Sequence, residues 1–259
     1  MSEAGYDGFR LDLDAARERA DLVLCRPPLN VISMAQRDQL RTVFEELDRD
    51  ERVRVIVLRA EGQHFSSGGQ ISGFLDASPE VVSRLAWNVA APARCHKPVI
   101  AANRGYCFGV GFELSLACDF RLVSDSCQYA LPEQKLGQIP GSGGSARLQK
   151  MIGITRTKNI VMRSLRIDAV KAVDWGIATE RVADANLEAA TDALVDELRA
   201  FSPLAQRTAK KLLNDTEDAS LSIAIELEGH CYSRLRSSDD FREGVLAFGE
   251  KRAPKFTGA

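Results

Sequence analysis

Two glutamates lie in apolar segments of the chain, where a carboxyl group can exchange protons near neutral pH. Glu113 falls within Phe112–Cys118, on the first turn of an expected helix, and Glu133 follows Ala130–Pro132 in a loop. Apolar surroundings raise a carboxyl pKa, which suits such a group to accept and donate protons. Taken singly, plainer interpretations remain open: an acid favoured by the helix dipole at Glu113 and a solvated loop acid at Glu133.

Two glycine-rich loops have the composition of an anion site. The first is His64–Ile71, after an expected strand, and the second is Asn103–Leu114, between an expected strand and an expected helix. If they face each other, two backbone N–H donors could meet one oxygen and form an oxyanion hole. Glycine spacing alone favours a pair of tight turns. A dinucleotide site at Gly109-Val-Gly111 is disfavoured, because Leu114 occupies the position of the third glycine.

The elements that must position these residues alternate between strand and helix. Such alternation predicts parallel winding of βαβ units. Beyond residue 142 the pattern is helical, and Gly153 and Gly176 are expected to end two helices capped by Ser142 and Asp168. Expected strands cover 9–13, 21–25, 52–58, 98–102 and 119–123, and expected helices cover 34–47, 79–93, the end of 105–118, 187–201 and most of 202–248.

Composition excludes several classes of function. The 259 residues contain 34 Lys plus Arg against 36 Asp plus Glu, so the chain lacks the basic excess of nucleic-acid-binding proteins. No apolar stretch is long enough to span a membrane, and Met1–Gly8 lacks the features of a signal peptide. Six cysteines without a CxxC pair predict reduced thiols in the cytoplasm, and the three histidines show no metal-ligand spacing.

Several motifs follow one another along the chain in a fixed order. They are Arg26–Asn30, His64–Ile71, Lys97–Gly105, Gly109–Leu114 with Ala117–Asp119, and Pro132–Gly137 with Ile139–Gly144. Taken together, they resemble the crotonase (enoyl-CoA hydratase/isomerase) superfamily over nearly the whole length. The final segments Phe241–Gly244 and Phe248–Arg252 resemble that family's carboxyl-terminal CoA-pocket helix.

The resemblance implies an α/β fold, a crotonase-type spiral of ββα units with a helical C-terminal region. Residues 1–200 would form the spiral core, and residues 201–259 a helical trimerisation region. The implied partners are an acyl-CoA thioester and further copies of the chain, as a homotrimer or a dimer of trimers. Coenzyme A is then part of the substrate, with no other cofactor, no metal, no nucleic acid and no membrane.

The resemblance also assigns roles to individual residues. Glu113 and Glu133 match the two hydratase glutamates, and the oxyanion amides fall on Ser67 and Val110. Retention of both acids favours hydration of a 2-enoyl-CoA to a 3-hydroxyacyl-CoA, as in fatty acid metabolism. A double-bond isomerase using Glu133 alone, or a non-catalytic acyl-CoA-binding protein, are the alternatives, and the acyl group is left open. Implied substrate contacts are Leu29, Phe65, Gly68, Gly69, Gln70, Ile71, Gly109, Pro132 and Gly141.

Three positions depart from the family pattern. Val110 stands where many members have glycine, but a backbone donor requires only its N–H. Gln70 replaces a frequent aspartate in the first loop. Phe112 adds bulk beside Glu113, and its apolar neighbours predict that it packs in the core.

Overall fold

A computed structural model of the chain describes residues 5–72, 74–75 and 77–259. Residues 1–4, which belong to the amino-terminal segment Met1–Gly8, and residues 73 and 76 lie outside this described part. Within it, six strands form a sheet in the order β1-β2-β3-β4-β6-β9, parallel throughout except for the antiparallel β1–β2 pair. The strands are Phe9–Asp14 (β1), Arg19–Leu24 (β2), Val55–Ala60 (β3), Val99–Asn103 (β4), Phe120–Ser124 (β6) and Glu180–Val182 (β9).

Helices cover both faces of this sheet, as expected when the central strands β2 and β4 are buried along their whole length. Alternate side chains of β3 point to opposite faces: Ile56 and Leu58 join the main core, while Val55 and Val57 pack with Leu187 on α7 (Leu187–Arg199). The other helices of the core are α1 (Met34–Arg49), α2 (Pro79–Val89), α3 (Ala91–Arg94), α4 (Val110–Leu116), α5 (Gly144–Met162) and α6 (Ala169–Asp174).

A second, smaller sheet brings the two glutamate segments together. It has the order β5-β7-β8, from strands Tyr106–Phe108, Gln128–Ala130 and Ile167–Asp168. Strands β5 and β7 are parallel, so their carboxyl ends meet at one edge of the sheet. The chain leaves β5 into α4, which carries Glu113, and leaves β7 into the 3-10 helix η1 (Pro132–Leu136), which carries Glu133.

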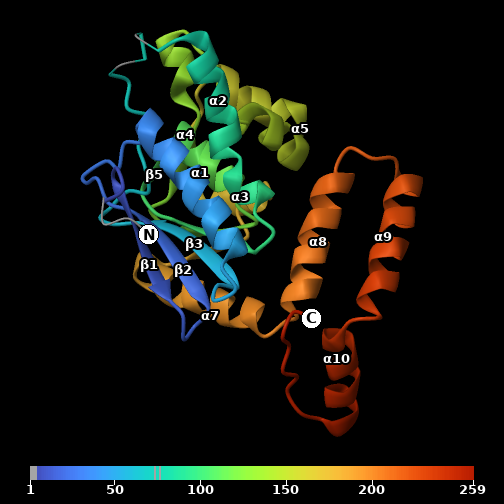
Figure 1. Cartoon of the computed structure of the whole chain (residues 1–259). Helices are drawn as coiled ribbons and strands as arrows, with labels where there is room; N and C mark the ends of the chain where they lie inside the picture. Colours follow the sequence, from blue (N-terminus) through green and yellow to red (C-terminus); the bar gives the residue numbers. More distant parts are fainter. Residues whose placement is uncertain (1–4, 73, 76) are drawn as a thin grey trace.

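The last three helices, α8 (Pro203–Thr216), α9 (Leu221–Leu235) and α10 (Asp239–Glu250), stand to one side of the sheets (Figure 1). Lys210 of α8 ties this region to the core, because its Nζ donates to Asp119 Oδ2 at 2.7 Å and to the Pro92 and Lys97 carbonyls at 2.9 Å. α9 has no buried residue. The helical character predicted for the C-terminal region is therefore confirmed.

The predicted alternation of strand and helix is confirmed, with local differences. The expected helix 79–93 is interrupted at Ala90, and the helix expected to end at Gly153 runs on to Met162. Gly153 takes φ 75° and ψ 166°, so the chain kinks there and resumes its helix. All six cysteines are free thiols, as predicted. No helix in the described ranges has the length and apolar content needed to cross a membrane.

Candidate active site

The two glycine-rich loops approach each other at their backbones. A Cβ added to Gly109 would lie 3.7 Å from the Gly68 Cα, and one added to Gly68 would lie 3.4 Å from the Phe108 carbonyl oxygen. Gly68 has φ 117° and Gly109 has φ 50°, values that favour glycine over any residue with a Cβ. Close approach and left-handed backbone therefore both account for the glycines at this meeting point.

Two backbone amides beside this meeting point have no acceptor in the described part of the chain. Ile32 forms a parallel bridge with Gly69, accepting from Gln70 N at 3.0 Å and donating to Gly68 O at 2.9 Å. In this pairing the N–H of Gly69 itself points away from Ile32. Val110 begins α4, where the amide has no carbonyl one turn earlier within the helix. The Gly69 and Val110 amides are thus available to an outside acceptor.

The prediction for Ser67 is corrected by the same geometry. Its amide donates to the Leu29 carbonyl at 2.8 Å, so that N–H is already occupied inside the protein. Ser67 and Gly69 lie two residues apart, and of their two amides only that of Gly69 donates no hydrogen bond to the segment Leu29–Ile32. Gly69 takes the place that the sequence argument gave to Ser67.

Glu113 is held in a fixed position by the start of α5. Its side chain is 3% exposed, and Oε1 accepts from Ser142 N at 2.7 Å and from Gly144 N at 3.1 Å. A Cβ on Gly144 would lie 3.0 Å from the Glu113 Cγ, so glycine leaves room for this contact. Burial raises the pKa of Glu113, and the two amide hydrogen bonds partly oppose that rise.

Glu133 lies against the glycine that precedes the free Val110 amide. Its Oε1 would be 3.1 Å from a Cβ on Gly109, and its buried Oε2 has no hydrogen-bond partner. Burial raises the pKa of Glu133 to about 7, and the charge of Glu113 adds to the rise. The two carboxyl groups interact electrostatically, so the protonation of one affects the pKa of the other.

The remaining predicted contact residues fall into two groups. Phe65 is fully buried in the main core, which corrects its assignment as a substrate contact because no part of its side chain faces solvent. Leu29 and Ile71 are exposed apolar side chains, Gln70 donates from Nε2 to Ser72 Oγ at 2.9 Å, Gly141 is exposed and Pro132 half-buried.

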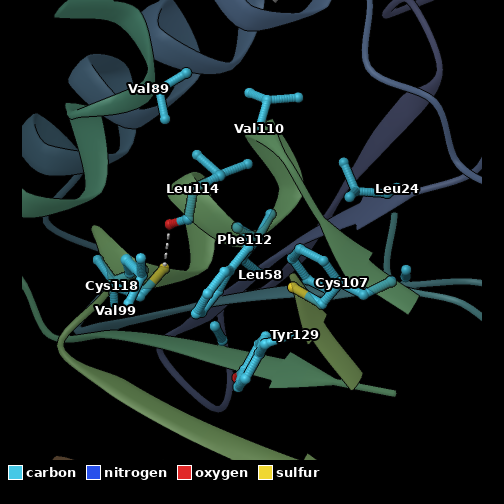
Figure 2. Packing of buried hydrophobic residues seen from close by; sticks show 14 of the residues in the cluster. Leu24, Leu58, Val89, Val99, Cys107, Val110, Phe112, Leu114, Cys118 and Tyr129 are labelled. Carbon is cyan, nitrogen blue, oxygen red and sulfur yellow. Dashed lines mark hydrogen bonds between the residues drawn. The ribbon is translucent and has the colours of Figure 1, made fainter. Parts of the chain in front are cut away.

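Beneath the site, packing and hydrogen bonds fix α4. Phe112 is fully buried and stacks on Tyr129 with ring centroids 4.2 Å apart, which confirms its predicted place in the core (Figure 2). Asn103 Oδ1 accepts from Ser115 Oγ and from Tyr129 OH, both at 2.8 Å, and so joins β4, α4 and β7. No pattern in the sequence predicted this polar network, which sets the direction of the helix that carries Glu113.

Comparison with known proteins gives consistent results. Residues 20–259 match the family model described as Enoyl-CoA hydratase/isomerase. A carnitinyl-CoA dehydratase from Proteus mirabilis is 32% identical over 246 residues, which cover 92% of this chain and 94% of that protein. The solved structure of an enoyl-CoA hydratase subunit from Geobacillus kaustophilus has a TM-score of 0.93 and 30% identity, covering 99% of this chain and 100% of that one. An enoyl-CoA hydratase from Bacillus anthracis has a TM-score of 0.92 and 29% identity, covering 98% and 100%.

Proposed function

The chain belongs to the enoyl-CoA hydratase/isomerase family and has its crotonase-type fold, and from that premise we propose that it adds water to a 2-enoyl-CoA thioester. The product is the 3-hydroxyacyl-CoA. One observation carries the proposal: Glu133 lies against Gly109 next to the free Val110 amide, Glu113 lies one turn further along α4, and the pKa of both carboxyl groups is raised. A hydratase needs two proton-transfer groups next to one oxyanion site, and this arrangement supplies them.

The two amides polarise the substrate in this proposal. The thioester oxygen accepts from Gly69 N and Val110 N, and electron density moves from the double bond toward that oxygen. The β-carbon becomes electrophilic, and enolate-like charge grows on the oxygen as water attacks. Because this charge is largest in the transition state, the donors stabilise that state more than the bound substrate.

The two glutamates divide the proton transfers. Ionised Glu113 takes a proton from water through the carboxylate that the Ser142 and Gly144 amides hold in place. The hydroxide part of that water bonds to the β-carbon, and protonated Glu133 gives its proton to the α-carbon. The pair ends with the proton on Glu113 in place of Glu133, so exchange with solvent restores the starting state.

An isomerase using Glu133 alone is the main competing function. It would need no second acid, whereas Glu113 is buried, oriented by two amides and electrostatically linked to Glu133. The relative named carnitinyl-CoA dehydratase also favours water chemistry, since dehydration is hydration run in reverse. A binding protein without turnover is the second alternative.

A panel of linear and cyclic 2-enoyl-CoA esters tests the proposal. Loss of the enoyl absorbance, with a product heavier by one water, is the expected result for at least one ester. A 3-enoyl-CoA converted to its 2-enoyl isomer at constant mass, without hydration, would favour the isomerase. Tight binding of every ester without any change in mass would favour the binding protein.

A further inference from the structure

Arg37 occupies a position that a charged side chain seldom takes. It lies on the buried face of α1 in line with Leu40, Phe44 and Leu47, and its side chain is 5% exposed. Residues at this spacing share one face of a helix, and apart from Gln36 the other buried residues of α1 are apolar. A buried guanidinium is expected to have a partner, because an unpaired charge in the interior is costly.

Arg37 has no such partner in the described part of the chain. Among the described residues no oxygen accepts a hydrogen bond from its guanidinium, and its Nε is buried without a partner. The other two buried arginines are different: Arg19 Nε donates to Asp21 at 2.6 Å, and Arg121 Nε donates to the Ile177 carbonyl at 2.5 Å. Burial lowers the pKa of Arg37, which agrees with a cation whose desolvation nothing fully compensates.

The guanidinium lies at the candidate active site. A Cβ added to Gly69 would lie 2.7 Å from the Arg37 Nη2, so the group is next to the residue whose amide is free for the thioester oxygen. Phe74 covers another side, with its ring centroid 5.7 Å from Arg37 Cζ. Glu113 is close enough to act on the pKa of Arg37. An arginine keeps its proton at all ordinary pH values, so it cannot share in the proton transfers.

We propose that Arg37 binds an anionic group on the acyl chain, and that the preferred substrate class is a short 2-enoyl-CoA ending in a carboxylate. The inference rests on the proposed function and names its substrate class. A guanidinium binds a carboxylate through two parallel hydrogen bonds, which would satisfy the unpartnered Nε. Because Arg37 lies beside Gly69, the carboxylate must be only a few carbons from the thioester carbonyl.

Arg147 provides a matched control for electrostatic effects. Its guanidinium also acts on the pKa of Glu113, and its own pKa is lowered by burial. It lines a different place, the groove between the core and α8 that Leu116 and Lys210 also line. If Arg37 served only to adjust Glu113, substitution of either arginine would change activity with all substrates alike.

Binding of saturated analogues tests the inference without requiring turnover. Calorimetric titration should give the wild-type protein at least about tenfold tighter binding of glutaryl-CoA than of pentanoyl-CoA, which matches it in chain length. Arg37→Met should remove that preference while leaving pentanoyl-CoA affinity within about threefold, because methionine fills similar volume without the charge. Arg147→Met should leave the ratio of the two affinities unchanged.

Turnover separates this inference from the proposed function. Glutaconyl-CoA should have a higher kcat/KM than pent-2-enoyl-CoA, and an enoyl-CoA with a quaternary ammonium end should be the poorest of the three. Absence of turnover with all three esters, together with preferential glutaryl-CoA binding, would reject hydration and keep the role of Arg37. Equal wild-type affinity for glutaryl-CoA and pentanoyl-CoA would overturn that role, and this result needs no variant. An equal loss of both affinities in a folded Arg37→Met protein would also overturn it.

Discussion

Glu113→Gln separates hydration from its alternatives. The glutamine side chain has the same shape, and its carbonyl oxygen can accept from Ser142 N and Gly144 N as Oε1 does now, at 2.7 and 3.1 Å. A hydrogen bond to a charged acceptor contributes about 1.5–3 kcal/mol, and a neutral one about 0.5–1.5 kcal/mol. The weaker bonds are offset because a neutral amide costs less to bury than a carboxylate. We therefore expect the free energy of unfolding to change by no more than about 1 kcal/mol.

The effect on catalysis should be much larger. A positioned general base contributes about 10²–10⁴-fold to a rate. At about 1.36 kcal/mol for each factor of ten, its loss raises the barrier by about 3–5 kcal/mol. The Glu113→Gln protein should therefore lose at least about a hundredfold in kcat/KM for hydration while keeping its thermal unfolding midpoint.

The assay follows loss of the enoyl thioester absorbance at substrate concentrations below KM. Glu226→Gln is a suitable control, since the Glu226 side chain is 75% exposed on α9 and distant in the chain from both glutamates. A Glu113→Gln rate within about fivefold of wild type would refute the role of Glu113 as the base, and a retained isomerase activity would identify the competing function.

Three further predictions follow from the same site. Because Glu133 must hold a proton to deliver it, and burial raises its pKa to about 7, kcat/KM for hydration should fall as the pH rises above that value; a flat pH–rate profile would contradict this. Val110→Pro removes the amide at the first position of α4, where proline fits a helix, and should cost about 10²–10³-fold in kcat, whereas Ser67→Ala should be mild; equal effects would contradict the amide assignment. Exposed apolar side chains on α9 and α10, including Leu221 and Phe248, predict a trimer or a dimer of trimers by light scattering, and a stable monomer would reject it.

Many of the helices and strands could be predicted from the sequence, because the spacing of apolar residues indicates which face of a helix or strand is buried. The expected strand at 98–102 corresponds to β4 at Val99–Asn103, and the expected helix at 34–47 to α1 at Met34–Arg49. The short strands β5 and β7 were missed, since three residues are too few to show a periodic pattern. These two strands nevertheless decide how Glu113 and Glu133 come together.

The site was predictable in part. Both glutamates were identified because each stands in an apolar segment and matches a family motif. The choice between Ser67 and Gly69 could not be made from residue types, because it depends on which N–H the pairing with Leu29–Ile32 leaves free. The spacing of Arg37 was informative, because it precedes Leu40 by three residues on a helix face that is apolar apart from Gln36.

Hydration itself is tested most directly by incubating the protein with crotonyl-CoA in water enriched in heavy oxygen and weighing the product by mass spectrometry. We predict a 3-hydroxyacyl-CoA heavier than the substrate by one labelled water, with the label on the β-carbon, and almost none of it from the Glu113→Gln protein. An unchanged mass with crotonyl-CoA and with its longer, cyclic and carboxylate-bearing analogues would contradict the assignment of this protein as a hydratase.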